Sequence, residues 1–173
     1  RLYYAGGWID VDLGDSGHFG YGETDDHRYD EVVDTGYITG CSLLVRSSVL
    51  ELIGYMDEDY FLYFEETEWC VKAQSHGFRL VYMPKSIVYH KESVSTRKIS
   101  GAFTYYMTRN RLYFMSRNGN KVRWLKRLRT DLHSLLRCIY HLELVHTRSM
   151  VVAYWHWLRG FTGPLECPSK CKL

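Results

Sequence analysis

The segment YFLYFEETEWC, residues 60–70, places three carboxylates directly behind a run of aromatic and aliphatic side chains. Burial of an ionised carboxylate without a partner costs free energy or raises the pKa of the acid. Two interpretations are open for Glu65, Glu66 and Glu68. They form the first turn of a helix, where the helix dipole favours negative charge, or at least one lies at the edge of an apolar cleft for chemistry. The first interpretation does not explain the aromatic run.

The residues after this run predict a helix over 65–76. Trp69, Cys70 and Ala73 fall on one side of it, and Gly77 stands where a left-handed C-terminal cap belongs. Further helices are predicted over 48–54, with Ser47 or Ser48 as N-cap and Glu51 as capping-box residue, and over 102–118, 121–145 and 149–159. Strands are predicted as two short pieces before residue 14, then over 32–48, 78–84 and 86–90, with a long polar loop before residue 32.

The composition favours one compact domain with a real core. The chain has 173 residues, of which 46% are hydrophobic and 16% aromatic. No apolar run is long enough to span a bilayer, and the first residues lack the features of a signal peptide. The five cysteines are scattered and odd in number, which favours a reducing, cytoplasmic compartment. Cys167 and Cys171 lack a second pair and do not indicate a zinc site.

The net charge of +2 hides two opposite halves. Residues 1–100 carry 9 Lys and Arg against 17 Asp and Glu, a net charge of −8. Residues 101–173 carry 13 against 3, a net charge of +10. The acidic half fits a site for a cation or a hydroxylated substrate, and the basic half fits an anionic partner.

The order of these motifs resembles family 2 glycosyltransferases, especially their rhamnosyltransferase-like branch. The resemblance rests on TGCSLLVRSS, the aromatic-acidic segment that opens a helix, the strand endings at Pro84 and His90, and YYMTRNRLYF, and it covers about residues 1–118. It implies an α/β chain that is the acceptor-side half of a GT-A, Rossmann-like domain (1–118), followed by a basic helical C-terminal extension (119–173).

The resemblance also implies an activity. Such enzymes use a divalent cation, Mg or Mn, and transfer a sugar from a nucleotide-diphospho-sugar with inversion. The acceptor is a glycan or a lipid-linked sugar of cell-surface polysaccharide synthesis. A base must take the proton of the acceptor hydroxyl as that hydroxyl attacks. Glu66 matches the base position and Glu65 the acid before it, while His90 matches a histidine that ligates the metal in several relatives. Gly40, Cys41, Glu68 and Arg109 are expected to contact the acceptor or substrate, and for Arg109 an ion pair with Glu65 or Glu68 is the alternative.

Two departures from the family pattern stand out. Relatives usually have Asp at the base position, where this chain has Glu66, which is one methylene longer. The nucleotide-binding half and its D-x-D metal motif are expected upstream of residue 1, so the chain is interpreted as the carboxyl-terminal part of a transferase and as inactive alone. Asp10-Val11-Asp12 spells D-x-D but lies in a strand, and Asp25-Asp26 lies in the polar loop.

The basic helices after residue 119 admit three interpretations. They pack on the catalytic half, they form a homodimer through a leucine stripe, or they lie on the anionic inner face of the cell membrane with Trp124, Trp155 and Trp157 at the interface. The basic residues match no nucleic-acid-binding motif, so no nucleic-acid partner is expected. The alternative to a transferase is a non-catalytic binding or scaffold module that kept the acceptor-side fold. The stripe residues are Leu125, Leu128, Leu132, Leu135, Ile139 and Leu142.

Overall fold

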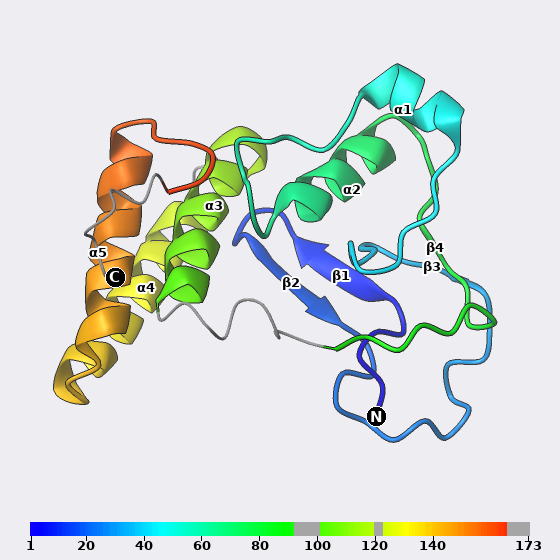
Figure 1. The fold of residues 1–173 in the computed structure, drawn as a ribbon, viewed down its shortest axis with the longest axis horizontal. Helices are drawn as coiled ribbons and strands as arrows, with labels where there is room; N and C mark the ends of the chain where they lie inside the picture. Colours follow the sequence, from blue (N-terminus) through cyan, green and yellow to red (C-terminus); the bar gives the residue numbers. More distant parts are fainter. Residues whose placement is uncertain (92–100, 120–122, 166–173) are drawn as a thin grey trace. The chain divides into compact units, whose positions relative to one another are not determined.

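The computed structural model describes residues 1–91, 101–119 and 123–165, and its described part is a mixed α/β structure. It contains two small two-stranded sheets and five helices (Figure 1). The chain divides into two compact units. The first comprises residues 1–10, 16–57 and 65–91; the second comprises residues 11–15, 58–64 and the chain from residue 92 onward.

The first unit is built on short strands and two helices. Strand β1 pairs with β2, and β3 pairs antiparallel with β4 in the register Val33 to Tyr82. Buried side chains of Tyr37, Trp69 and Cys70 meet those of α1 in one apolar core. The elements are β1 (Gly7–Asp10), β2 (Asp15–His18, whose first residue belongs to the second unit), β3 (Val33–Asp34), α1 (Ser47–Ile53), α2 (Glu65–Ser75) and β4 (Val81–Tyr82).

Helix α2 confirms the helix that the sequence predicts behind the aromatic run. Trp69, Cys70 and Ala73 are buried on one face, and the three glutamates occupy its first turn. Gly77 follows the helix with φ of +82°, the left-handed conformation that glycine adopts at no steric cost. Helix α1 is also confirmed, but its cap is not: Arg46 is the N-cap, and no side chain caps the first turn.

The strands are shorter than the sequence predicts. Of the strand predicted over 32–48, only β3 forms, because the residues after Asp34 find few backbone partners. Hydrogen bonds that involve side chains hold this segment instead, among them the bond from the Tyr37 hydroxyl to Glu66. Residues 86–90 form no strand, so that prediction is wrong. Of the two short strands expected before residue 14, one is confirmed as β1, whereas β2 (Asp15–His18) lies in the segment that the sequence predicts as a polar loop.

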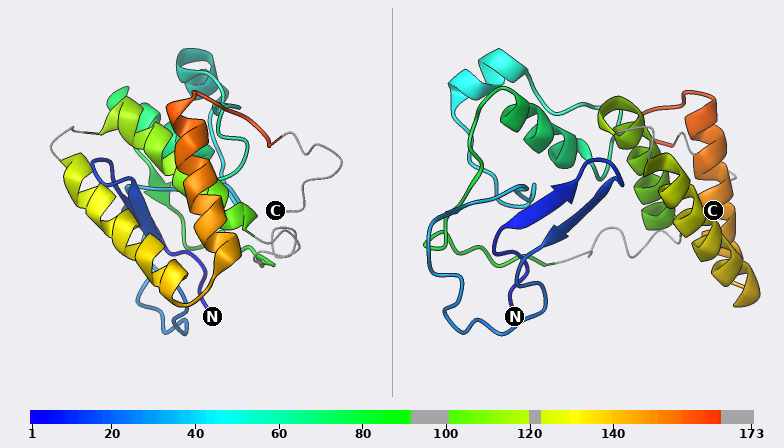
Figure 2. Two further views of the ribbon diagram at one scale, coloured as in Figure 1. Left: turned by 90° about the vertical axis from the view of Figure 1, so that its left-hand side faces the viewer. Right: turned by 180° about the vertical axis from the view of Figure 1, so that it is seen from behind.

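The second unit is helical. Helices α3 and α5 lie side by side, and α4 packs on α5 (Figures 1 and 2). Phe64 packs on Phe114 of α3 with ring centroids 5.6 Å apart, which places part of the aromatic run in this core. Arg127 and Asp131 form a buried ion pair on α4, and Asp131 also accepts a hydrogen bond from the hydroxyl of Tyr154. The helices are α3 (Ala102–Asn118), α4 (Trp124–Tyr140) and α5 (Leu144–Leu158).

Helix α3 confirms the predicted range, whereas the two later helices differ from it. The long helix predicted to Val145 ends at Tyr140, and α5 begins at Leu144 rather than at Ser149. Leu142 turns the chain between them with φ of +57°. The division predicted near residue 118 is one of composition and function, and it stays a prediction. In the part of the chain that the structure describes, no helix has the length and apolar character needed to cross a bilayer.

Candidate active site

Glu66 lies at the start of α2 with its carboxylate held on one side only. The hydroxyl of Tyr37 donates a hydrogen bond of 2.8 Å to Glu66 Oε1. Glu66 Oε2 is buried and has no hydrogen-bond partner among the described residues. An unpaired buried carboxylate oxygen is costly, so it marks a position where an external donor would be favourable. A proton-bearing group that approached Oε2 would complete this arrangement.

Hydrogen bonds from neighbouring side chains to its backbone carbonyl hold Tyr37 in place. The hydroxyl of Tyr4 donates to the Tyr37 carbonyl at 2.6 Å, and Thr35 Oγ1 donates to the same oxygen at 3.1 Å. The next residue, Ile38, donates its N–H to Sγ of Cys70 on α2 at 3.4 Å. The irregular segment around Tyr37 therefore has a defined position against α2, although it belongs to no strand.

Aromatic rings extend from Tyr37 to His90. The His18 ring stacks on Tyr37 with centroids 5.5 Å apart and an interplanar angle of 20°. Tyr3 contacts His18 edge-on at 4.9 Å and His90 at 4.7 Å. Stacked and edge-to-face rings at these distances attract each other and hold a defined geometry. The two residues that the family resemblance marks as base and metal ligand, Glu66 and His90, are therefore linked through three intervening rings.

Glu65 differs from Glu66 in its electrostatics. Burial, and secondarily the negative charge of Glu66, raise the pKa of Glu65 to about 7. Its Oε2 is also buried without a partner among the described residues. Near neutral pH, Glu65 thus exists as a mixture of the acid and the carboxylate. Such a pKa suits a group that exchanges protons near neutral pH.

Gly40 lies against Glu66 and is exposed. A Cβ atom placed on Gly40 would lie 3.8 Å from the Cβ, Cγ and Cδ atoms of Glu66, which is ordinary contact. Cys41 is exposed, and its Sγ accepts a hydrogen bond from Thr39 Oγ1 at 3.6 Å. The structure therefore brings Gly40 to the predicted base. Glu68 lies one residue beyond Thr67 in the same helical turn and is half-buried. The roles predicted for these residues stay predictions.

Arg109 is enclosed in the second unit. Its side chain is 1% exposed, and its five N–H groups donate to Asn110 Oδ1, the Tyr105 hydroxyl and the carbonyls of Asp59, Tyr60 and Gly163. These contacts give Arg109 a structural role in holding residues 59–60. Its predicted contact with substrate would require some of these bonds to break, and it stays a prediction.

The described residues do not complete a metal site around His90. His90 is exposed, and it belongs to no group of three or more His, Cys, Asp or Glu side chains within reach of one ion in the described ranges. The one such group found there is Asp25, His27 and Asp30, which is fully exposed. His27 Nδ1 and Asp30 Oδ2 lie 2.9 Å apart as an ion pair. Exposed acidic groups of this kind are common without a metal, and Cys167 and Cys171 lie outside the described residues.

Tyr37 and His18 are the site residues that the sequence did not single out. Tyr37 is part of the motif VVDTGYITG, and His18 is the second residue of GHFGYGETDDHRYD. Both segments contributed to the family resemblance, but no spacing rule connects them with Glu66, which follows Tyr37 by 29 residues. An aromatic residue next to Gly36 in a β-rich segment predicted packing rather than contact with an acid.

Comparison with known proteins identifies several relatives of low identity. The chain is 23% identical over 135 residues to the low-salt glycan biosynthesis hexosyltransferase Agl10 of Haloferax volcanii, a match that covers 73% of the chain and 43% of that protein. It is 25% identical over 131 residues to the dTDP-rhamnosyl transferase RfbF of Shigella flexneri, covering 69% of the chain and 44% of that protein. The chain thus spans less than half the length of these relatives.

A third relative matches over a shorter stretch. The N-acetylglucosaminyl-diphospho-decaprenol L-rhamnosyltransferase of Mycobacterium tuberculosis is 36% identical over 61 residues, which is 35% of the chain and 20% of that protein. No family model and no solved structure matches the chain. All three named relatives are glycosyltransferases, in agreement with the resemblance at the level of that enzyme class. The GT-A fold and the inverting mechanism stay predictions.

Proposed function

We propose that this chain carries the catalytic base of an inverting glycosyltransferase that moves a hexose or rhamnose from a nucleotide-diphospho-sugar to a glycan or lipid-linked acceptor. The observation that carries the proposal is the Glu66 carboxylate, whose Oε1 is fixed by Tyr37 and whose Oε2 is buried without a partner among the described residues. The sugar class comes from the names of the relatives, which are hexosyl and rhamnosyl transferases.

The geometry supports a defined proton transfer. The acceptor hydroxyl approaches over exposed Gly40 and donates its proton to Oε2 of Glu66. As the proton leaves, the hydroxyl oxygen forms a bond to the anomeric carbon, and the bond from that carbon to the diphosphate breaks on the opposite face. The nucleoside diphosphate departs with the electron pair. The hydrogen bond from Tyr37 keeps Oε1 occupied, so that Oε2 is the oxygen left to accept the proton.

Glu65 has a separate part in this proposal. Its pKa near 7 allows Glu65 to hold a proton near neutral pH, so that Glu65 adds little negative charge beside the proposed base. Glu68, Cys41 and Arg109 stay proposed contacts of the acceptor or substrate. Of the residues predicted to contact the acceptor, Gly40 is the one whose distance to Glu66 supports that role.

Dependence on a divalent cation is a separate proposal. His90 would supply one imidazole ligand, and the remaining ligands would come from the diphosphate and from residues outside those described. The described residues do not complete such a site, and the proton transfer to Glu66 proposed here does not involve the cation. Removal of Mg and Mn with a chelator from the full-length protein, followed by assay of sugar transfer, tests this proposal directly.

The substitution Glu66→Gln in the full-length protein tests the assignment of the base. The amide keeps the size of the side chain but cannot accept the proton, so we expect transfer to fall by about 10²- to 10⁴-fold. The dissociation constant of the nucleotide-sugar should change by no more than about threefold, which corresponds to less than about 1 kcal/mol of binding free energy. Glu51→Gln, at an exposed position on α1, is the matched control. Unchanged transfer in Glu66→Gln would refute the base assignment.

A non-catalytic binding or scaffold module that kept the acceptor-side fold is the second candidate. Such a module would bind a glycan without transferring sugar. Calorimetry of the full-length protein with a nucleotide-diphospho-sugar, with and without Mn, separates the candidates. Cation-dependent binding supports the transferase, whereas glycan binding without any nucleotide-sugar affinity supports the module.

A further inference from the structure

The apolar stripe of α4 faces solvent instead of a core. Leucines at three- and four-residue spacing lie on one face of a helix, and here that face is open: Leu125 is 69% exposed and Leu132 is 54% exposed. The sequence pattern alone would favour burial of this stripe. The stripe residues of α4 that are exposed are Leu125, Leu128, Leu132 and Ile139, and Leu136 beside them is exposed as well.

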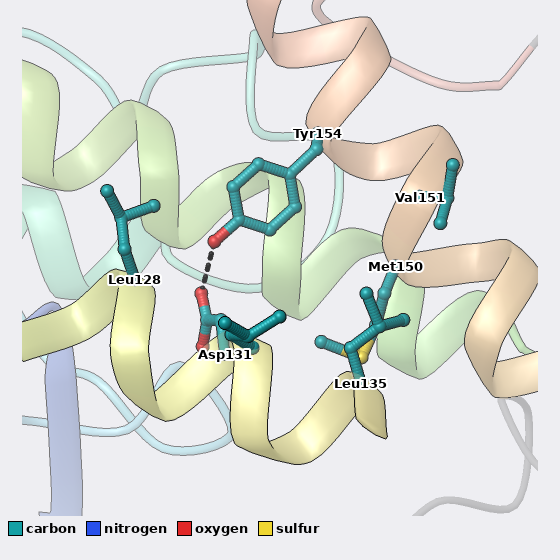
Figure 3. A pocket seen from close by; sticks show the side chains of 7 residues that line it. Leu128, Asp131, Leu135, Met150, Val151 and Tyr154 are labelled. Atoms are coloured by element: carbon teal, nitrogen blue, oxygen red, sulfur yellow. Dashed lines mark hydrogen bonds between the residues drawn. The ribbon is translucent and has the colours of Figure 1, made fainter. Parts of the chain in front are cut away.

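Helix α5 extends the same apolar surface. Leu128 and Leu132 of α4 line a cavity of about 300 Å³ together with Met150, Val151 and Tyr154 of α5. Figure 3 shows the side chains that line this cavity, with the hydrogen bond from Tyr154 to Asp131 among them. Because Leu128, Leu132 and Val151 both line the cavity and are exposed, the stripe of α4 runs into a groove shared with α5. Further exposed apolar residues on α5 are Leu144, Trp155 and Leu158.

Basic side chains border this apolar surface. Lys126, Arg129 and Arg137 are exposed and repeat at three- and then eight-residue spacing, which places them along one edge of α4. Arg148 on α5 is also exposed. The described residues 123–165 hold 7 Lys and Arg against 2 Asp and Glu, a net charge of +5. Arg127 pairs with Asp131 and Asp15 inside the unit, and Arg123 pairs with Asp12, so the cationic charge beside the stripe is carried by the exposed residues Lys126, Arg129, Arg137 and Arg148.

We propose that the exposed apolar face of α4 and α5, here called the amphipathic face, docks onto a lipid bilayer that contains anionic headgroups. A helix with an open leucine stripe and a cationic edge lies in the interface of such a bilayer, with its apolar side chains in the acyl region and its cations at the phosphates. Trp155 is 52% exposed, and the Arg159 guanidinium lies over its ring at 4.3 Å. An indole beside a cation suits the headgroup level.

Charge decides between a bilayer and a second copy of the chain. In a two-fold dimer whose axis runs across α4, the cationic edge of one amphipathic face would lie against the same edge of the other. Like charges in such a contact oppose association. An anionic bilayer instead offers the opposite charge next to an apolar interior. The proposal concerns this surface alone and does not depend on the catalytic role of Glu66.

Vesicle sedimentation of the full-length protein tests the proposal. We expect at least tenfold stronger binding to vesicles of phosphatidylcholine with phosphatidylglycerol than to vesicles of phosphatidylcholine alone. High salt should weaken binding to the anionic vesicles, because it screens the electrostatic attraction. Leu132→Glu should reduce binding at least tenfold because it places a charge in the stripe. Leu52→Glu is the matched control, as Leu52 is a similarly exposed leucine on α1, outside the amphipathic face.

Light scattering on the same samples identifies the other occupant. A protein that ignores both kinds of vesicle, but forms a dimer that Leu132→Glu dissociates and Leu52→Glu does not, would overturn the bilayer proposal in favour of a second copy. Equal binding by Leu132→Glu and the unchanged protein would also overturn it. Circular dichroism of each variant confirms that the helices are retained. Sugar transfer by Leu132→Glu to a soluble acceptor analogue reports on the function separately.

Discussion

The hydroxyl of Tyr37 lies 2.8 Å from Oε1 of Glu66, and the two residues are 29 positions apart. Tyr37 is buried, so this bond is shielded from water and pairs an acid on α2 with a segment outside any strand. Hydrogen bonds to an ionised acceptor are stronger than bonds between neutral groups. The bond therefore stabilises the fold and orients the acid at the same time.

Removal of this hydrogen bond should cost measurable stability. Tyr37→Phe keeps the ring on His18 but leaves Glu66 Oε1 without a donor, so we expect the free energy of unfolding to fall by about 1–3 kcal/mol. Urea denaturation measures this difference. Tyr55→Phe, at a residue 81% exposed, should change it by less than about 0.5 kcal/mol. Equal stability of both variants would show that the Tyr37–Glu66 bond contributes nothing.

The raised pKa of Glu65 predicts how stability varies with pH. The folded protein keeps the proton of Glu65 up to about pH 7, whereas an ordinary carboxyl of this kind has a pKa of 4.5. The stability that this proton contributes is fully present below pH 4.5 and is lost as the pH rises through about 7. Glu65→Gln removes the cost of ionisation, so we expect the variant to gain about 1–2 kcal/mol over the unchanged protein above neutral pH, allowing for solvent screening.

Urea denaturation at about pH 5 and about pH 8 measures this difference. The gain should be small at the lower pH and larger at the higher pH. Glu51→Gln, at an exposed acid of α1, should show no such trend. A gain for Glu65→Gln that is the same at both pH values would contradict the raised pKa.

Asn110 should be indispensable for the fold of the second unit. Its Nδ2 donates to the carbonyls of Tyr60, Leu62 and Tyr63 at 2.8–2.9 Å, and its side chain is fully buried. Asn110→Leu has a similar volume but no donor, so the carbonyls of Leu62 and Tyr63 lose their hydrogen bonds from Asn110, while the carbonyl of Tyr60 keeps its bond from Arg109. We expect a loss of about 3 kcal/mol or more, measured by thermal or urea unfolding. Ser116→Ala, on the exposed side of α3, is the control and should be nearly neutral.

Gly40 offers a test that separates access from folding. An added methyl group would meet Glu66 only at ordinary contact distance, and Gly40 is not in the left-handed region, so Gly40→Ala should change stability by less than about 0.5 kcal/mol. If acceptors approach Glu66 over Gly40, transfer by the full-length variant should fall about tenfold or more, mainly through a higher KM for the acceptor. Ser42→Ala, also exposed, should leave KM unchanged. An unaltered KM in Gly40→Ala would place the acceptor elsewhere.

The sequence predicts the local features of this fold well. Helices α2 and α3 follow from apolar spacing and from a glycine just after the C-terminal end of each, which are signals carried within about ten residues. The break between α4 and α5 is different. No glycine or proline stands at residues 141–143, and a leucine adopts the positive φ, so the sequence offers no stop signal there. The helices were therefore predicted to divide in the wrong place.

Features that depend on distant partners could not be read from the sequence. A β-rich composition predicts a strand over 32–48, but a strand needs a neighbour to bond with, and only Val33 and Asp34 find one. The aromatic run before Glu65 is explained in the same way. Phe61, Tyr63 and Phe64 have positive φ, a strained conformation for such residues, and the buried side chains of Arg109 and Asn110 hold the carbonyls around them.

The hydrogen bonds from Asn110 to the carbonyls of residues 60–63 also indicate an order of folding events in the second unit. Helices α4 and α5 follow each other directly in the chain, so closing the short loop between them costs little entropy and this pair can form early. The bonds of Asn110 join residues 47–50 positions apart and require α3 to be in place before the strained segment can be captured. We expect Asn110→Leu to accelerate unfolding far more than it slows refolding, as befits contacts that form after the rate-limiting barrier.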